Sequence, residues 1–320
     1  MKNLLITGCS GFLAPFLIDA LMDTGSGARP GNDIKISGFT EVPGYKSSKI
    51  KVYNIDIRDR GKVFDVVETV KPDVVFHLAA VSNVGFSWKH QELTYQINFI
   101  GSSNLLEALA AFSPRCRVLL MSSAELYGAS DVDKMNEALP TCARNPYALS
   151  KIAMEMAADL YIQSMGMDIV KLRSFNFTGP GQDRKFVASD FSCQIAEIEK
   201  GKREPVIRVG NLSAVRDISD VRDIARYLAV ISRGVKEKET GGIYNLCSGS
   251  TYSIRDILDI LLLLSAKKID VMEDRDRFRP IDVPRLAGDN ALIERTFSLR
   301  PEYTLEQTLS DLLAYWRDRI

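Results

Sequence analysis

A tyrosine and a lysine four positions apart are the residues of this chain whose types and spacing best suit acid/base chemistry. Tyr147 and Lys151 lie in the segment NPYALSK, residues 145–151. In a helix, this spacing places the phenol and the ammonium on one face. A free tyrosine has a pKa of about 10, so it is a poor acid/base at neutral pH unless a cation such as Lys151 favours the phenolate. Because the pair alone also fits two solvated neighbours on a helix surface, other segments must decide between the two interpretations.

A glycine turn near the N-terminus predicts a dinucleotide site. An apolar, strand-like run at 2–7 is followed by Gly8, Gly11 and Ala14 in the turn GCSGFLA, and then by apolar residues at helical spacing. In a strand, turn and helix of this kind, the glycines let the backbone approach a pyrophosphate, and the helix N-terminus adds N–H donors and partial positive charge. Ala14 is small enough for the third position, and Pro15 lies early enough in the helix for its missing N–H to cost little.

The composition argues against several classes of function. The chain has 320 residues, 46% of them hydrophobic, and Lys plus Arg equal Asp plus Glu at 41 each. No overall basic field therefore favours nucleic acid or an anionic membrane surface. Five cysteines without paired spacing, no long apolar run, and a first segment interrupted by glycine, serine and proline indicate a cytoplasmic protein without a signal peptide. We expect no metal site.

Strand-like and helix-like segments alternate through the first half of the chain, which predicts a parallel sheet covered by helices on both faces. The expected strands are 34–38, 51–55, 74–78, 117–121 and 168–172, and the expected helices are 58–70, 88–112 and 147–165. Ligands of such sheets bind beyond the carboxyl ends of the strands. We therefore expect Gly8–Gly11, Ala79–Ala80 and Ser122–Ser123 to meet there.

The pattern changes after Arg173. The segment 174–190 is rich in glycine, proline and polar residues and is too long for an ordinary connector, which is typical of a substrate loop. Shorter elements follow, with helices near 191–200, 221–232, 254–264 and 305–319 and a strand near 206–209. We predict a Rossmann-type domain with a doubly wound parallel sheet at 1–173. A smaller α/β substrate domain should occupy most of 174–320, with the chain able to cross back to the first sheet.

Several further motifs occur in one order along the chain. They are TGCSGF (7–12), Asp56-Ile57, HLAA (77–80), Asn98-x-x-Gly101, SSAELYG (122–128), Tyr147 to Lys151, and FNFTGPGQ (175–182). With these motifs the chain closely resembles, over nearly its whole length, the extended short-chain dehydrogenase/reductases that modify nucleotide sugars. The resemblance implies a nicotinamide dinucleotide cofactor held at its pyrophosphate, adenine and nicotinamide ends. The implied contacts are Gly8, Gly11, Phe12 and Leu13; Asp56 and Ile57; and Leu78, Ala79, Ala80, Asn98, Tyr147 and Lys151.

The resemblance also assigns the catalytic groups. Ser123 matches the active-site hydroxyl of the family, which donates a hydrogen bond to a sugar ketone while Tyr147 delivers or removes a proton. Lys151 would both lower the Tyr147 pKa and bond the nicotinamide ribose. Glu125 takes the place where dehydratases keep a proton-abstracting glutamate, but Ala124 stands where glucose dehydratases keep an acid for the leaving hydroxyl. Because GDP-mannose dehydratases also lack that acid and reductases can retain the glutamate, this site leaves dehydration and reduction open.

The second half of the chain narrows the reaction. Stretches at 190–199, 209–217 and 279–289 resemble the GDP-mannose branch, and Val283-Pro284 and the short length resemble its reductases more than its dehydratases. The implied reaction is NAD(P)H-dependent reduction of the C4 ketone of GDP-4-keto-6-deoxy-D-mannose to GDP-D-rhamnose. A GDP-mannose 4,6-dehydratase, a nucleotide-sugar 4-epimerase and a non-catalytic NAD- or nucleotide-sugar-binding regulator are the alternatives, although a regulator has no need of Ser123, Tyr147 and Lys151 together.

The substrate contacts implied by the same resemblance come from several segments. Arg216 and Arg279 would bond the diphosphate bidentately, and the alternative for each is an ion pair with Asp217 or Asp282. The implied substrate contacts are Ser82, Asn176, Val187, Asn211, Arg216 and Arg279.

Cofactor choice and assembly complete the expectations. Phe39 lies where NAD enzymes usually keep an acid and NADP enzymes a base, while Glu41 could reach a ribose 2′-OH and would repel a 2′-phosphate. We therefore expect NAD(H) rather than NADP(H). The resemblance implies a homodimer through a four-helix bundle, and burial against the sheet is the alternative for its candidate residues. These candidates are Ile97, Ile100, Leu105, Leu106, Met154, Ala157 and Ala158.

Overall fold

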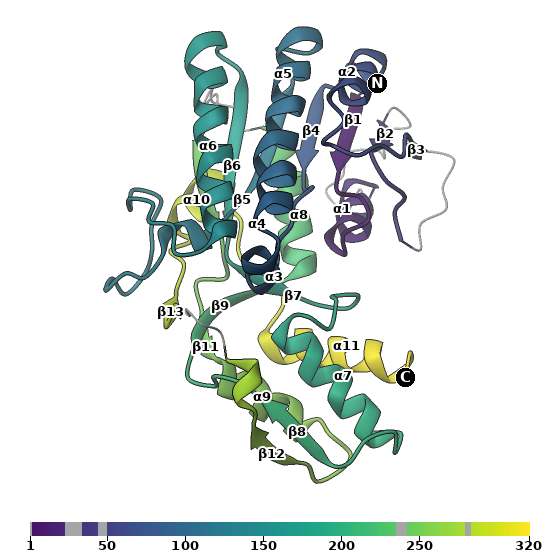
Figure 1. Ribbon diagram of the computed structural model, residues 1–320, viewed down its shortest axis with the longest axis vertical. Coiled ribbons are helices and arrows are strands. Elements are labelled where there is room, and N and C mark those ends of the chain that lie inside the picture. Colours follow the sequence, from purple (N-terminus) through teal and green to yellow (C-terminus); the bar gives the residue numbers. More distant parts are fainter. Residues whose placement is uncertain (1, 23–33, 44–49, 235–241, 279–282) are drawn as a thin grey trace.

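The protein folds into two lobes that meet at a waist (Figure 1). The structure is a computed structural model that describes residues 2–22, 34–43, 50–234, 242–278 and 283–320. One lobe holds a parallel sheet between layers of helices, and the other holds short strands and three helices. In the part of the chain that the structure describes, every helix is too short or too polar to cross a membrane.

A seven-stranded sheet forms the first lobe, with the strand order β10-β6-β5-β4-β1-β2-β3 and every neighbouring pair parallel. Strand order reverses between β1 and β4, which creates a switch point at their carboxyl ends. The predicted Rossmann-type parallel sheet is confirmed. The strands are β1 (Lys2–Thr7), β2 (Ile34–Gly38), β3 (Ile50–Val52), β4 (Val74–His77), β5 (Arg117–Ser123), β6 (Asp168–Ser174) and β10 (Gly242–Leu246).

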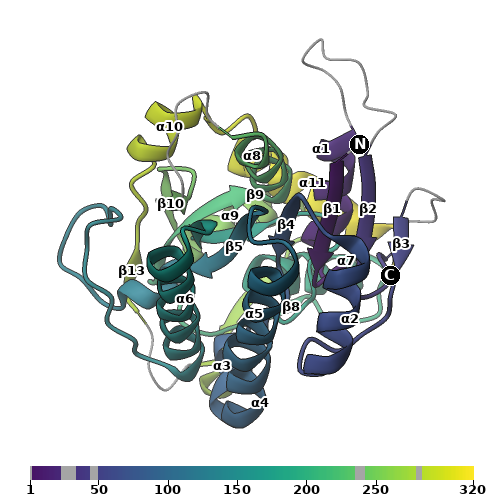
Figure 2. The same ribbon diagram turned by 90° about the horizontal axis from the view of Figure 1, so that it is seen from above.

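Helices cover both faces of this sheet, as the view from above shows (Figure 2). Alternate residues of β1 point to opposite faces, so Leu4 and Ile6 join the core under α1 (Leu13–Met22) and α8 (Val221–Ser232). Leu5 joins the core under α2 (Arg60–Val70), α5 (Ser102–Phe112) and α6 (Pro146–Met165). The apolar runs of the central strands are therefore a consequence of burial on both faces.

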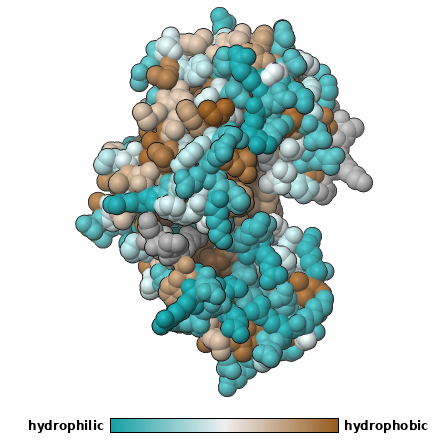
Figure 3. Space-filling view, in the orientation of Figure 1, coloured by the Kyte–Doolittle hydropathy of each residue, from teal (hydrophilic) through white to brown (hydrophobic). Residues whose placement is uncertain are grey.

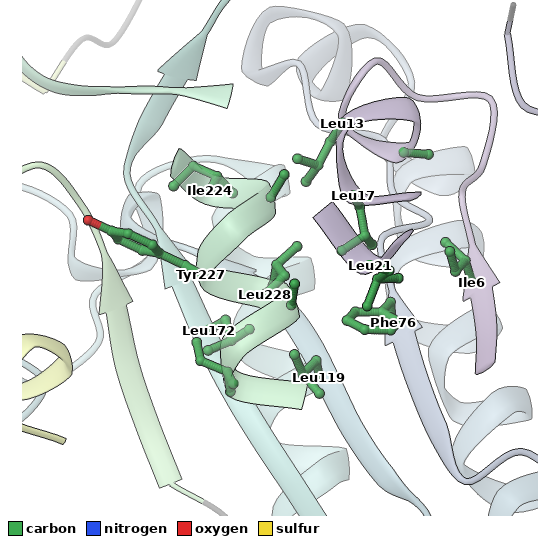
Figure 4. Packing of buried hydrophobic residues seen from close by; sticks show 14 of the residues in the cluster. Ile6, Leu13, Leu17, Leu21, Phe76, Leu119, Leu172, Ile224, Tyr227 and Leu228 are labelled. Atoms are coloured by element: carbon green, nitrogen blue, oxygen red, sulfur yellow. The ribbon is translucent and has the colours of Figure 1, made fainter. Parts of the chain in front are cut away.

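Figure 4 shows the first of these cores, in which α1 and α8 pack side by side on the sheet. Leu17 of α1 and Leu228 of α8 are both fully buried, above Phe76 and Leu119 of the sheet. Full burial of one such side chain contributes roughly 1.5–3 kcal/mol to folding. This packing fixes the N-terminal end of α1, and with it the glycine turn, relative to the strand ends.

The long helix expected at 88–112 is broken, and this is a correction. The structure has α3 (Val84–Lys89), α4 (Gln91–Tyr95), a π-helical turn η1 (Gln96–Gly101) and then α5. His90 leaves helical geometry between α3 and α4, with φ −137°. At Gly101 an added Cβ would lie 2.6 Å from Ile57 Cγ2, so the π-helical turn brings the backbone against this side chain. Apolar spacing alone does not report such a change of winding.

The second lobe has its own core, built by α7 (Val187–Glu199), α9 (Ile254–Leu263) and α11 (Leu305–Arg317). Strand β8 (Val206–Val209) pairs with β12 (Asp270–Glu273), which precedes the short turn η3 (Arg275–Arg277). A second small sheet centres on β9 (Val215–Asp220), which pairs with β7 (Asn176–Thr178), β11 (Thr251–Ser253) and β13 (Arg285–Leu286). This sheet carries the chain from the first lobe to the second.

The second half of the chain also returns to the first lobe. Helix α8 packs on α1, β10 pairs with β6, and α10 (Ala291–Phe297) covers β10 through the ring contact of Tyr244 with Phe297. The sequence predicted the helix that became α8 but not the strand β10. Residues on both sides of position 173 therefore build the first lobe. The domain division at residue 173 stays a prediction.

Candidate active site

The carboxyl ends of the parallel strands border a cavity of about 780 Å³ at the waist between the lobes. Figure 3 shows an indentation of the surface at this waist. Its walls come from the turns after β1, β4 and β5, the start of α6, the segment around β7 and the start of α7. This is the place where open α/β sheets bind ligands. Most of the residues singled out from the sequence line it: Gly8, Gly11, Phe12, Leu13, Asp56, Ile57, Leu78, Ala79, Ala80, Ser82, Ser123, Glu125, Tyr147, Lys151, Asn176 and Val187.

The glycine turn brings two strand ends into backbone contact. Gly8 has φ +74°, and an added Cβ would lie 2.6 Å from the backbone nitrogen of Ala79. The turn closes with hydrogen bonds from the Gly11 N–H to the Gly8 oxygen at 3.0 Å and from the Ala14 N–H to the Gly11 oxygen at 3.2 Å. Helix α1 then starts at Leu13, so its first N–H groups open on the cavity.

Tyr147 stands at the N-terminus of α6, where a capped start fixes its position. Asn145 is the N-cap, its Oδ1 accepts the Ala148 N–H at 2.7 Å, and Pro146 occupies the first turn. The Asn145 side chain also donates to Glu125 Oε2 at 3.1 Å. One residue therefore ties the catalytic helix to the short helix η2 (Ala124–Tyr127) that follows β5.

Ser123 joins the phenol of Tyr147 to the end of β5. Its hydroxyl accepts the Glu125 backbone N–H at 3.2 Å and faces the Tyr147 phenol closely enough to act on its pKa. Burial raises the pKa of Tyr147 to about 12, with the Ser123 hydroxyl opposing the shift and Glu125 adding to it. The phenol is therefore held protonated at neutral pH and can act as a proton donor.

Lys151 is buried one helical turn further along α6, with only 2% of its surface exposed. Its Nζ donates to the Met121 carbonyl oxygen at 2.7 Å. Burial lowers the pKa of Lys151 to about 8, and the charge of Glu155 opposes that shift. The expectation that Lys151 lowers the Tyr147 pKa below its ordinary value is wrong for this structure, because desolvation of the phenolate dominates and the pKa lies above that value.

Asn98 has a different task from the cofactor contact expected of it. Its side chain is fully buried in η1, accepts the Val81 N–H at 2.7 Å, and donates to the Val81 oxygen at 3.0 Å and to Ser150 Oγ at 2.9 Å. These bonds use its acceptor and both amide hydrogens within the protein. Asn98 therefore holds the turn after β4 against α6.

The substrate residues of the second half are only partly brought together. Arg216 is buried in β9, two residues before Ile218 on the same face of the strand, and it pairs in register with Leu286. Ile218 and Leu286 line the cavity, so Arg216 lies just beyond its wall. Asn211 Oδ1 accepts the backbone and hydroxyl hydrogens of Ser213, which forms a turn away from the cavity lining. Arg279 lies outside the described residues.

Several cavity residues had no separate signal in the sequence. The rings of Phe12 and Phe177 stack with centroids 5.4 Å apart, which joins the glycine turn to β7. Thr178 donates to Gln182 Oε1 at 2.6 Å, and the Gln182 amide donates to the Phe177 oxygen at 2.8 Å. Phe177, Thr178 and Gln182 lay inside a family motif, but their mutual contacts depend on how the loop folds.

Two observations show that the cavity suits a dinucleotide. At Gly8 an added Cβ would meet the Ala79 backbone, so the tight turn with its N–H donors at the cavity wall depends on glycine. The Ser122 hydroxyl is buried against the cavity without a hydrogen-bond partner among the described residues. Buried hydroxyls are normally paired, so this one indicates a ligand contact. The donor-rich turn and the unpaired hydroxyl together fit a phosphate-containing, polar ligand.

Comparison with known proteins agrees with this geometry. The family model described as GDP-mannose 4,6 dehydratase matches residues 5–312 of the chain. The chain belongs to this family. The resemblance to extended short-chain dehydrogenase/reductases that modify nucleotide sugars is thereby confirmed, as is the expectation of an enzyme.

Two curated relatives of this family member have names that describe enzymes acting on GDP-linked deoxy sugars. GDP-6-deoxy-D-mannose reductase of Pseudomonas aeruginosa is 34% identical over 252 residues, covering 78% of this chain and 82% of the relative. GDP-6-deoxy-D-talose 4-dehydrogenase of Aggregatibacter actinomycetemcomitans is 28% identical over 289 residues, covering 90% and 88%. The solved structure of RMD from Pseudomonas aeruginosa, complexed with NADPH, superposes with a TM-score of 0.85 at 28% identity and covers all of both chains.

Replacing Gly8 by alanine tests whether the glycine turn binds the cofactor. We expect Gly8→Ala to abolish measurable NADH or NADPH binding in fluorescence titrations, because the new Cβ would push against the Ala79 backbone and displace the turn. Gly166→Ala is the matched control, since Gly166 also has positive φ, +65°, but has nothing within 4 Å of the added Cβ. The control should lose roughly 1–2 kcal/mol of unfolding free energy and keep its cofactor affinity. Equal cofactor affinity in Gly8→Ala and wild type would contradict the assignment.

Proposed function

We propose that this protein reduces the C4 ketone of GDP-4-keto-6-deoxy-D-mannose to GDP-D-rhamnose, with a reduced nicotinamide dinucleotide as the second substrate. The observation that carries the proposal is the buried, protonated Tyr147 beside Ser123 in the lining of the cavity that also contains the glycine turn. The similarity to the GDP-6-deoxy-D-mannose reductase of Pseudomonas aeruginosa supports the choice of sugar.

The protein's own groups supply polarisation and a proton. When bound, the reduced nicotinamide supplies the hydride. Ser123 Oγ accepts the Glu125 N–H, and its one hydrogen, which acts on the Tyr147 phenol, would turn to a ketone oxygen to polarise the carbonyl. Tyr147 then donates its proton to the oxygen that becomes the alcohol. Lys151, one helical turn further along α6, would bond the nicotinamide ribose, as the resemblance implies.

The cavity walls suggest which residues would hold each ligand. We assign the pyrophosphate to Gly8, Gly11, Phe12 and Leu13, the adenine to Asp56 and Ile57, and the nicotinamide side to Leu78, Ala79 and Ala80. Asp56 is already fixed by a bidentate bond from Arg58 at 2.6 to 3.0 Å. The sugar nucleotide would contact Ser82, Asn176 and Val187. The resemblance alone assigns the diphosphate to Arg216, which lies just beyond the cavity wall, and to Arg279.

The preference for NAD(H) stays a prediction. Phe39 is buried after β2, and the Thr40 hydroxyl, which lines the cavity, accepts the Ser10 N–H at 3.0 Å. Glu41 is exposed beside them and would repel a 2′-phosphate. The structure of the Pseudomonas aeruginosa RMD with NADPH favours the other cofactor. A direct comparison of turnover with both reduced cofactors decides between them.

The decisive assay supplies GDP-4-keto-6-deoxymannose with NADH or NADPH, follows cofactor oxidation and identifies the sugar. We expect oxidation in both assays, faster with NADH, and GDP-D-rhamnose as the product. GDP-6-deoxy-D-talose differs from GDP-D-rhamnose in its configuration at C4. If it is the product, the protein would belong instead with the talose 4-dehydrogenase relative. Oxidation with neither cofactor would contradict the proposal. Conversion of GDP-mannose alone would favour the dehydratase or epimerase.

Glu125 distinguishes reduction from dehydration within the same site. Reduction requires no base next to the keto group, so Glu125→Gln should keep reductase turnover within about threefold of wild type. Tyr147→Phe, which removes the proton donor, should lower turnover by about 10²-fold or more. Circular dichroism checks that both variants fold. A collapse of reductase turnover in folded Glu125→Gln would count against this scheme and favour dehydration or epimerisation.

We also propose a homodimer through α6 and the neighbouring helices, with a corrected set of contacts. Leu105, Leu106, Met154 and Ala158 are buried in the core beneath the helices, so they cannot form an interface. The exposed apolar side chains lie instead at Ile100, Leu149, Met156 and Leu160, and Figure 3 shows apolar residues gathered over α6. Ala157 is partly exposed on the same helix, whereas Ile97 packs against the core and lines the cavity.

The dimer proposal predicts the effect of one charge. Leu160 is 67% exposed, so Leu160→Glu should leave the fold intact and convert the dimer to a monomer in light scattering after size exclusion. Leu263→Glu, at an 86% exposed leucine of α9, is the control and should stay dimeric. A wild-type monomer, or a dimeric Leu160→Glu variant, would contradict the proposed interface.

A cytoplasmic location is part of the same proposal. The cysteines Cys9, Cys116, Cys142, Cys193 and Cys247 are all free. Free cysteines of this number are typical of proteins kept in a reducing compartment.

A further inference from the structure

The buried face of α6 continues past Tyr147 and Lys151 to Glu155. The three residues recur every four positions, and Glu155 is only 5% exposed. Residues at this spacing lie above one another on a helix. An acid at this depth is uncommon unless it is paired or serves another group.

Lys151 needs a counter-charge that its own hydrogen bonds do not provide. The described partners of its Nζ are the Met121 carbonyl oxygen at 2.7 Å and the Met154 sulfur at 3.9 Å, and both are neutral. Moving an ammonium out of water without an opposite charge favours its neutral form. Among the described groups, Glu155 is the acid whose charge raises the Lys151 pKa against this burial.

A second cation keeps the Glu155 carboxylate in place. Arg173 of β6 donates from Nη2 to Glu155 Oε2 at 2.8 Å and from Nε to the two carboxylate oxygens at 3.2 and 3.3 Å. The guanidinium is itself fixed, because it lies 4.9 Å from the centre of the Tyr127 ring and donates to the backbone carbonyl oxygen of Glu137 at 3.4 Å. Both side chains of the pair are about 6% exposed.

The other ionisable groups around Lys151 do not supply negative charge. His77 at the end of β4 is held between Thr7 and Ser102, and burial together with the Lys151 charge lowers its pKa to about 3. Tyr147 is protonated at neutral pH, and burial raises the pKa of Tyr127 to about 12. Arg173 is positive. Across the working pH range His77 is therefore neutral and the two phenols carry their protons.

We propose that Glu155, fixed by Arg173, is a positioning residue that keeps the Lys151 ammonium charged and thereby sets the alkaline limit of activity. This inference rests on the proposed reductase function only for its kinetic measurement. The ordinary alternative is an ion pair that merely joins α6 to β6. The same two elements carry such a pair one turn further along, where Lys171 Nζ lies 2.5 Å from Asp159 Oδ1.

The test compares Glu155→Gln with Asp159→Asn in the full-length protein. In Glu155→Gln, the pH at which reductase kcat/KM falls on the alkaline side should move down by roughly one unit or more, about tenfold in rate above that limit. The pH at which NADH affinity weakens in fluorescence titrations should move in the same direction, because the resemblance places Lys151 on the nicotinamide ribose. Glu155→Asp, which keeps the charge, should restore most of the shift.

The control separates electrostatics from packing. Asp159→Asn also breaks an ion pair between α6 and β6, in which Lys171 is buried and Asp159 is 40% exposed, so it should lose stability without moving either pH limit. Unchanged pH limits in folded Glu155→Gln, or an equal shift in Asp159→Asn, would overturn the proposal. If Glu155→Gln does not fold, Glu155→Gln/Arg173→Gln, which removes both charges of the buried pair, takes its place; a smaller downward shift is expected, because the Arg173 charge is lost too, and unchanged pH limits would overturn the proposal. If the wild-type protein binds NADH but reduces no sugar, the proposed function is wrong. The pH dependence of NADH binding then decides this inference alone.

Discussion

The burial of the Lys151 ammonium beneath the end of β5 is the constraint on which the rest of the site depends. A cation without water must be held by dipoles and opposite charge, and here the Met121 carbonyl and the nearby Glu155 carboxylate provide them. The same lack of water raises the pKa of Tyr147 and keeps its proton on the phenol. The pair that we propose as the proton source is therefore created by burial as much as by the four-residue spacing.

The fold keeps this buried pair open to a ligand on one side only. Two apolar cores fix α1 and α6 on opposite faces of the sheet, so the glycine turn and the tyrosine meet at the strand ends. Asn145 then links the start of α6 to Glu125, and Asn98 links the turn after β4 to the same helix. The second lobe closes the remaining side through β7 and α7. Rigid elements thus position the proposed proton donor, while loops form part of the cavity wall.

Local signals explain what the sequence could predict. The spacing of Tyr147 and Lys151, the turn at Gly8 and the alternation of strands and helices depend on neighbours along the chain, and each of these features is present in the structure. Contacts between distant segments were less accessible. An acid such as Glu155 looks like a solvated helix residue until Arg173 of β6 is placed beside it.

Helix faces and winding were the main sources of error. Leu105 and Met154 fit an exposed stripe as well as a buried one, and only the position of the sheet shows that they face inward. The π-helical turn η1 and the strand β10 depend on a close backbone approach and on a distant partner strand, respectively. Family motifs located Ser123 and Asn98, but the hydrogen bonds of Asn98 are within the protein.

The pH dependence of kcat/KM for reduction by the wild-type protein tests the central claim most directly. Sugar reduction needs the proton of Tyr147 and the charge of Lys151, whose pKa values lie near 12 and 8. The rate should therefore be level through neutral pH and fall as pH rises through the Lys151 pKa, with Tyr147→Phe slower by about 10²-fold or more throughout. A reduction rate that rises with pH across this range would show that an ionised group, and not a protonated tyrosine, performs the limiting step, and it would contradict this account.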